Sequence, residues 1–337
     1  MKRKIQTIIP IFFSLIILSI ILGCDSFNSR GPSKITEINN PNDLAYDFHD
    51  IRVVFTKSVS NGTNLTIKSL DFQEDRTYLI EKHINDLSIS PDGRFAVYSN
   101  REQLENVQPI YLWRLDLFNH VEDKIGGWNE DYSIIYIGNP SFSSDGKQII
   151  FSVTWFSTGK IGVGLVNSDG SNFRILDTDL PLAEGPKLSQ NGSHIIVTCV
   201  GNEKTSGLMR FQLCILDKDG KYITTITNSG DAHGSYFFSP EDEYIIYNEL
   251  NRGGIFKQRK DFLYISFPDY ENRQLVLDWV VGVQAFSFDG QQIVFEGRPN
   301  KKSSWGIYII NIDGTDLRHL TYFDEFLEDW YADIKDY

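Results

Sequence analysis

One pattern of apolar and polar residues returns along this chain. Leu87–Asn100 reads LSISPDGRFAVYSN, an alternating run, a Pro-Asp-Gly turn and a second run that is apolar almost throughout. Similar phrases stand at 140–153 (PSFSSDGKQIIFSV) and 285–297 (AFSFDGQQIVFEG). Alternation predicts a half-buried β-strand, and a short continuous apolar run predicts a strand buried on both faces. A single hairpin would need the phrase once, so its recurrence indicates a repeated β unit.

Each phrase turns at a position suited to positive φ. Aligning the phrases on this turn gives slots 46 to 53 residues apart, at Gly93, Gly146, Gly192, Asp242 and Gly290. Asp-Gly between apolar runs is a strong hairpin signal, because glycine has no Cβ to clash at positive φ. A repeat of this length predicts one supersecondary unit used several times.

Each unit contains four strand-like runs, which in the last unit are 284–287, 291–296, 305–312 and 317–321. The pattern of the third run occurs six times: NLTIKSLD (64–71), PIYLWRLD (109–116), IGVGLVNSDG (161–170), FQLCILDKDG (211–220), FLYISFPD (262–269) and WGIYIINI (305–312). Four-stranded sheets that bury both faces and repeat around an axis form a β-propeller. We therefore expect an all-β fold, a six-bladed propeller of four-stranded antiparallel blades over residues 43–337.

These motifs resemble the TolB-like propeller repeat. The best match is IYIINIDGTDLRHLT at 307–321, and the resemblance extends over about 43–337. It implies a TolB-like fold but little about function, since this repeat occurs in scaffolds, enzymes and peptidase accessory domains. TolB proteins carry an α/β domain before the propeller and are soluble in the periplasm. Here only a short segment precedes the repeat, so a role in the same envelope complex is not implied.

Two segments could supply the first strand of the first blade. Leu44–His49 precedes IRVVF (51–55), and Glu328–Asp333 (EDWYAD) also fits a first strand, beyond the last repeat. We expect the C-terminal segment to close this blade, because sharing one blade between both chain ends locks the ring.

The N-terminus is similar to a bacterial lipoprotein signal. Lys2, Arg3 and Lys4 precede an apolar run over 5–22, which ends in Ile-Leu-Gly before Cys24. This pattern predicts a signal peptide over 1–23, lipidation of Cys24 and a flexible tether over 24–42. The alternative is a transmembrane anchor, because the run approaches the length of a span. We expect a palmitate-carrying lipoprotein of the cell envelope, held to the membrane by its N-terminal lipid alone and facing the periplasm or the exterior.

Charge and cysteine content limit the partners. The chain carries a net charge of −13, and residues 24–337 carry −16 because the three leader cations are excluded. Such a surface repels phosphate backbones, so we expect no nucleic-acid partner. Beyond Cys24 there are two cysteines, Cys199 and Cys214, without zinc-ligand spacing. A cross-strand disulfide is one reading, but buried free thiols on neighbouring strands are the favoured prediction.

No nucleophile elbow, P-loop, zinc-protease motif or dinucleotide fingerprint occurs in the sequence, and we expect no cofactor and no metal. Propellers bind at the axial mouth, and the loops there offer these candidates: His83, Arg101, Trp155, Glu184, Asp231, His233, Glu249, Arg252 and Arg298. Each also has a structural reading: salt bridges for the arginines, a loop hydrogen bond for His233 and a packed cap for Trp155.

The leading hypothesis is a non-catalytic, lipid-anchored scaffold that binds an envelope protein or peptide. The alternative is a glycan-binding propeller or one similar to oligogalacturonate lyases, with a metal at the mouth. That resemblance rests on HGSYFFSP at 233–240. It implies several histidines around a divalent metal, of which only His83 and His233 are suitably placed.

Overall fold

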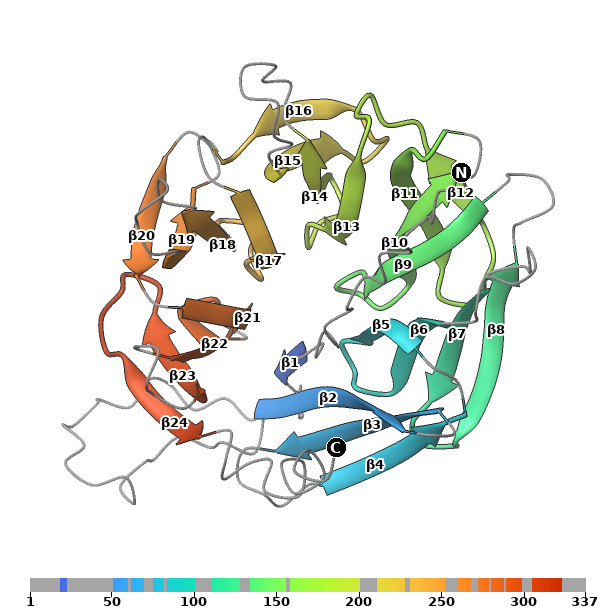
Figure 1. Cartoon of the computed structure of the whole chain (residues 1–337), viewed down its shortest axis with the longest axis horizontal. Helices are drawn as coiled ribbons and strands as arrows, with labels where there is room; N and C mark the ends of the chain where they lie inside the picture. Colours follow the sequence, from blue (N-terminus) through green and yellow to red (C-terminus); the bar gives the residue numbers. More distant parts are fainter. Residues whose placement is uncertain are drawn as a thin grey trace, which may run out of the picture.

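The computed structural model describes residues 19–22, 51–59, 62–69, 75–81, 84–100, 111–127, 134–155, 158–200, 211–227, 231–251, 260–267, 272–278, 280–287, 289–298 and 305–322. These residues form six four-stranded antiparallel sheets (Figure 1). No helix of this described part is long and apolar enough to cross a membrane.

The six sheets, here called blades 1 to 6, follow the chain. Blade 1 contains β1 (Ser19–Leu22), β2 (Ile51–Val59), β3 (Gly62–Ser69) and β4 (Asp75–Ile80). Blade 2 contains β5 (Ile84–Ile89), β6 (Phe95–Asn100), β7 (Tyr111–Asp116) and β8 (Val121–Gly127). Blade 3 contains β9 (Ile134–Phe142), β10 (Gln148–Trp155), β11 (Ile161–Asn167) and β12 (Arg174–Leu176). Blade 4 contains β13 (Ala183–Leu188), β14 (His194–Val200), β15 (Phe211–Asp217) and β16 (Tyr222–Thr225). Blade 5 contains β17 (Asp231–Phe238), β18 (Ile245–Asn251), β19 (Lys260–Ser266) and β20 (Arg273–Leu277). Blade 6 contains β21 (Val280–Phe286), β22 (Gln292–Arg298), β23 (Gly306–Asn311) and β24 (Arg318–Tyr322).

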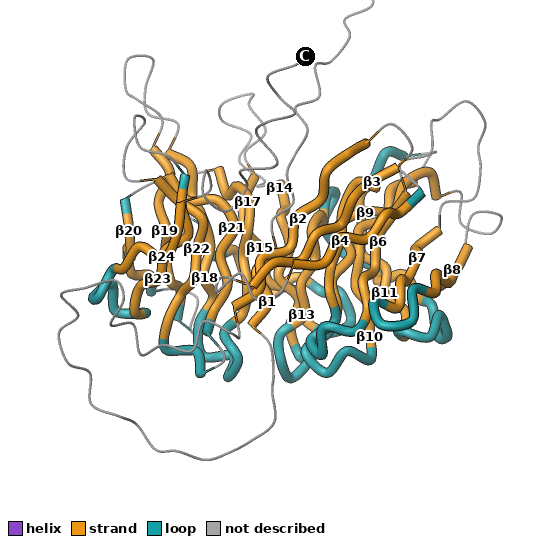
Figure 2. The backbone as a smooth tube through the Cα atoms, turned by 90° about the horizontal axis from the view of Figure 1, so that it is seen from below, coloured by secondary structure: helices purple, strands orange, loops and turns teal. Residues whose placement is uncertain are grey.

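The blades are arranged around an axis. The first strand of each blade contacts the first strand of the next, from β1 through β5, β9, β13, β17 and β21 and back to β1. The fourth strands, among them β4, β8 and β20, lie at the rim (Figure 1). The described tight turns collect on one face of the disc (Figure 2). This arrangement is the propeller that the repeat predicts.

A serine and an acidic residue build the turn between the first two strands. Ser143 Oγ donates to Asp145 Oδ1 at 2.7 Å and accepts the Gln148 backbone N–H at 2.9 Å. The turn glycines of blades 2, 3, 4 and 6 have φ of 68° to 69°. Serines stand in the same place in the other described turns, namely Ser90, Ser189, Ser239 and Ser287. The Ser-x-Asp-Gly spelling is therefore a hydrogen-bonded unit that fixes the register of each hairpin.

Blade 5 replaces the turn glycine with Asp242, which has a φ of 57°. Its carboxylate accepts the backbone N–H groups of Gln190 at 2.6 Å and Asn191 at 2.9 Å, both in the turn of blade 4. Asp tolerates the left-handed region better than most non-glycine residues. Here it also connects two neighbouring turns, which accounts for its presence.

The core lies between blades. Ile150 and Val163 of blade 3 share a buried cluster with Ile195 and Val197 of blade 4. On β10, Ile149, Ile150 and Phe151 are all fully buried, whichever face of the sheet they occupy. The continuous apolar run of the second strand thus indicates a strand packed on both faces, as the sequence predicts.

The first strand of blade 1 differs from the sequence expectation. The position beside β2 belongs to β1, with Leu22 opposite Ile51 and Ser19 opposite Val54. The prediction that Glu328–Asp333 holds this position is contradicted, and that segment and Leu44–His49 lie outside the described residues. The ladder needs only backbone N–H and C=O groups, so several extended segments can satisfy it and side-chain pattern does not select one. Cys24 and the predicted tether over 24–42 also lie outside the described residues. β1 itself falls within the predicted signal peptide over 1–23, so the pairing of β1 with β2 belongs to the unprocessed chain.

The prediction of free thiols is contradicted as well, because Cys199 and Cys214 form a disulfide between β14 and β15. Cys199 lies opposite Gln212, and Cys214 lies opposite Val197, so the cysteines are diagonal neighbours with Cα atoms 5.9 Å apart. This separation falls within the range that a disulfide spans. Register, which sequence alone does not supply, decided between the two readings.

Reducing this disulfide should destabilise the protein. The bond joins positions 15 residues apart, and a loop of this length corresponds to about 3 kcal/mol in the chain-entropy model. Urea unfolding of the oxidised and reduced chain measures the difference, with a Cys199→Ala/Cys214→Ala chain as control that should not respond to reductant. Equal midpoints for oxidised and reduced wild type would contradict the expected contribution.

Hydrogen bonds in the turns lower the pKa of several aspartates. The Lys147 backbone N–H, with help from the Ser143 hydroxyl, lowers the pKa of Asp145. The Thr315 hydroxyl and backbone N–H lower the pKa of Asp313 in a turn between third and fourth strands. Turn hydrogen bonds have the same effect at Asp169 and Asp217.

Acid should therefore weaken the fold through these turns. A carboxyl whose pKa is lowered by folding adds stability above its unfolded pKa of about 3.9, and this is lost as pH falls through the folded value. The free energy of unfolding should stay level down to about pH 5 and then decline. Asp145→Asn should flatten that decline and change neutral-pH stability little, since Asn191 occupies the equivalent turn position in blade 4. Denaturant titrations from pH 7 to pH 2 measure both slopes, and identical slopes would contradict the assignment.

Candidate axial site

The first strands that surround the axis are irregular. The pairing between first and second strands shifts register in each of blades 2 to 6. Asn139 and Gly185 lie at two of these irregular positions and have φ of 49° and 63°. β-Bulges of this kind redirect side chains and backbone groups, and they are frequent next to functional sites.

A polar residue six positions after the turn slot connects each of three blades to the next. Ser152 Oγ accepts the Gly185 backbone N–H at 2.9 Å, and Asn248 Nδ2 donates to the Gly282 carbonyl at 2.7 Å. The Thr198 backbone N–H donates to Tyr236 Oη at 3.2 Å. Ser99 and Glu296 occupy the same slot in blades 2 and 6. Sequence analysis did not single these residues out, although the alignment on the turn would have revealed a polar residue after every apolar run.

Asp86 of β5 is one of the acceptors that connect blade 2 to blade 3. Its Oδ2 accepts the Tyr136 hydroxyl at 3.1 Å and the Asn139 backbone N–H at 3.0 Å, both from β9. These two bonds hold the carboxylate at the axial edge of the sheets. Asp86 also acts electrostatically on two residues of blade 4, Glu184 and Lys187.

Glu184 and Lys187 are half-buried residues of opposite charge on β13. Burial raises the pKa of the Glu184 carboxyl, and the Asp86 carboxylate raises it further. Burial also lowers the pKa of the Lys187 ammonium to about 8, against the opposing influence of Asp86. The ammonium lies 5.4 Å from the centre of the Phe237 ring. Neither side chain has a hydrogen bond or ion pair with another described residue.

Charges held at an axis in this way can serve a ligand. Desolvated ionisable groups without an ion-pair partner are costly to a fold, and they are enriched at functional sites. A carboxylate and an ammonium within one strand suit a ligand that carries both signs of charge, as a peptide does. Asp86, Glu184 and Lys187 are therefore called the axial charge cluster below.

The structure separates the sequence-predicted mouth residues. Glu184 lies in the first strand β13 and belongs to the axial charge cluster. Glu249 is only 5% exposed, and its carboxylate pairs with Arg273 of the outer strand β20.

Two further candidates are packed rather than free. Trp155 packs against the buried cluster between blades 2 and 3. Its ring lies so close to Gly162 that a Cβ atom at position 162 would be 2.7 Å from it. The Arg298 guanidinium lies 5.0 Å from the centre of the Trp305 ring. The first observation favours the packed-cap reading of Trp155, whereas the Arg298 contact is with an aromatic ring rather than the salt bridge that the sequence predicts.

The side chains of the remaining candidates lie outside the part of the chain that the structure describes. His83, Arg101 and Arg252 lie outside the described residues. Asp231 and His233 belong to strand β17, but their side chains are outside the described set. Among the side chains that the structure does describe, no three of His, Cys, Asp or Glu gather as metal ligands would.

Removing the Asp86 charge should lower the pKa values of both Glu184 and Lys187. In Asp86→Asn the amide oxygen can still accept from Tyr136 and Asn139, but the negative charge that favours the Lys187 ammonium is gone. We expect the pKa of Lys187 to fall below 8 and the pKa of Glu184 to fall as well. NMR of the chain with ¹³C-methylated lysines, assigned with Lys187→Arg, measures the first shift. Asp92→Asn, the same change in an exposed turn, is the control, and an equal effect of both variants would contradict the cluster.

No protein-family model matches the sequence, and the comparison with curated proteins finds no match. Solved structures do match. TolB from Acinetobacter baumannii aligns with a TM-score of 0.58 at 17% identity, covering 81% of this chain. The chain spans 64% of the length of that TolB.

Two other propellers align over similar lengths. Oligogalacturonate lyase from Vibrio parahaemolyticus gives a TM-score of 0.59 at 15% identity, covering 82% of this chain and 75% of the lyase. The β-propeller domain of the trilobed protease from Pyrococcus furiosus, described as having an open velcro topology, gives 0.52 at 15% identity, covering 80% and 79%. At these identities the likeness concerns the fold alone. The chain has an all-β, TolB-like propeller fold of four-stranded antiparallel blades, as the repeat predicts.

Proposed function

We propose that this protein is a non-catalytic binding scaffold of the cell envelope, which takes a protein or peptide segment at the axis of its propeller. The observation that carries the proposal is the axial charge cluster. Glu184 and Lys187 are half-buried, oppositely charged and without an ion-pair partner among the described residues. A bound peptide can form an ion pair with Glu184 through a cationic group and with Lys187 through an anionic group.

Rigidity of the surrounding wall supports a binding role. The strands that carry the cluster are connected to their neighbours by Asp86–Asn139, Ser152–Gly185 and Tyr236–Gly185 hydrogen bonds. A site held by such bonds loses little conformational entropy when a ligand enters, so more of the contact energy appears as affinity.

The envelope location is part of the proposal. A buried disulfide persists in oxidising compartments outside the cytosol, and the Cys199–Cys214 bond fits that setting. The N-terminal pattern ending at Cys24 supports lipid anchoring. Processing before Cys24 would remove β1 (Ser19–Leu22), so in the lipidated chain the place beside β2 would pass to another segment. Several acyl chains on one residue hold a protein to a membrane far better than a single chain.

Site-directed photo-cross-linking in the native envelope tests this function. We expect a photoreactive benzoylphenylalanine at Phe237, beside Lys187, to give an adduct with an envelope protein. The same group at Tyr222, on the exposed rim, should not give it. Glu184→Gln/Lys187→Gln should reduce the yield of the Phe237 adduct about tenfold or more, since each hydrogen bond to a charged group contributes about 1.5–3 kcal/mol to binding.

The controls separate binding from folding and from catalysis. Glu241→Gln/Lys147→Gln removes the same charges from the turn face and should leave the adduct unchanged. An adduct that is insensitive to the axial variants would overturn the proposed site.

Release of unsaturated products from oligogalacturonate, abolished by His233→Ala, would replace the scaffold with the lyase alternative. Cys24→Ser should release the chain from the membrane fraction, which tests anchoring separately.

A further inference from the structure

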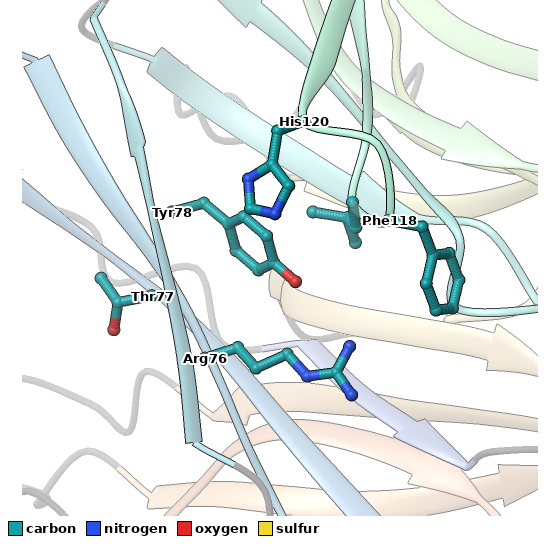
Figure 3. Close-up of a pocket in the computed structure, with 6 residues that line it drawn as sticks. Arg76, Thr77, Tyr78, Phe118 and His120 are labelled. Carbon is teal, nitrogen blue, oxygen red and sulfur yellow. The ribbon is translucent and has the colours of Figure 1, made fainter.

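A concave site lies at the rim of the propeller, between blades 1 and 2. It has a volume of about 340 Å³ and is lined by Arg76, Thr77, Tyr78, Leu117, Phe118 and His120 (Figure 3). The first three residues belong to the outer strand β4, and the others belong to the turn between β7 and β8. Ligand pockets in proteins begin at about 300 Å³, so the space suits a small group.

One buried carboxylate shapes the wall on the blade 2 side. Asp116 accepts the backbone N–H groups of Phe118 and Asn119, both at 3.0 Å, and the Arg94 guanidinium at 2.9 Å. These bonds fix the turn that presents the next residues, including His120 at a φ of 56°. The wall is therefore built before any ligand arrives.

Aromatic surface and one cationic group, the Arg76 guanidinium, meet in this pocket. The Tyr78 and His120 rings are 5.3 Å apart, and the Phe118 side chain remains 62% exposed. The Arg76 guanidinium, the Tyr78 hydroxyl and the Phe118 ring border the same space (Figure 3). None of the six lining residues is acidic, which contrasts with the net charge of −13 on the chain.

We propose that this rim pocket binds a carboxylate carried on an aromatic ring, the chemistry of a small aromatic acid or of a peptide that ends in Phe or Tyr. The guanidinium would hold the carboxylate through charge-assisted hydrogen bonds, for which its planar fork is suited. The ring would lie against the exposed Phe118, since aromatic pairs gain energy beyond area burial. This site goes beyond the proposed axial function and shares no residue with it, so either can fail alone.

Isothermal titration of the full chain in detergent, with four probes, tests the proposal. The probes are 3-phenylpropionate, 3-phenylpropanamide, N-acetylglycyl-phenylalanine and the C-terminal amide of that dipeptide. We expect at least one acid to bind at least tenfold more tightly than its amide. The acid that binds identifies the source as a free aromatic acid or a peptide terminus.

Variants of the pocket complete the test. Arg76→Gln should weaken binding of the acid about tenfold or more, Arg76→Lys should retain part of it, and Phe118→Ala should also weaken it. Arg174→Gln, an exposed arginine on the outer strand β12 of blade 3, is the matched control and should have no effect. Binding of neither acid, equal binding of acid and amide, or binding unaffected by Arg76→Gln would each overturn the proposal.

Discussion

The hydrogen-bonded turn between the first and second strands is the constraint on which the rest of this propeller depends. A buried serine accepts the backbone N–H of the residue five positions later, while a turn residue at positive φ reverses the chain. This geometry fixes the register of the hairpin. Register decides which apolar residues of the second strand enter the space between blades, because a shift of one residue would exchange the two faces.

The same turns and strands also join the blades. Asp242 reaches the turn of blade 4, and polar residues at the end of the apolar runs reach the bulged first strand of the following blade. Hydrophobic clusters that span two blades act alongside these bonds. Each blade is thus stabilised mainly by its neighbours, which is why a unit that buries two sheet faces has to be repeated around a ring.

Two sites of different chemistry follow from this framework. At the axis, bulges hold Asp86, Glu184 and Lys187 together although they belong to two blades. At the rim, the turn fixed by Asp116 places Phe118 and His120 against Arg76 and Tyr78. The proposed axial site offers both signs of charge, and the proposed rim pocket offers one cation and aromatic rings, so the two proposals concern ligands of different character.

Local patterns were enough to predict the repeated strands, the turns and the propeller, because alternation, apolar runs and positive-φ residues are local and repeat with the blade. It also indicated Glu184 as a residue near the axis. Tertiary structure decided the rest. Three contacts illustrate this: the Glu249–Arg273 ion pair, the Cys199–Cys214 disulfide and the pairing of β1 with β2. Each joins segments whose relative register cannot be read from a local sequence pattern. Lys187 and the rim pocket escaped sequence reasoning for the same reason, since their neighbours come from other blades.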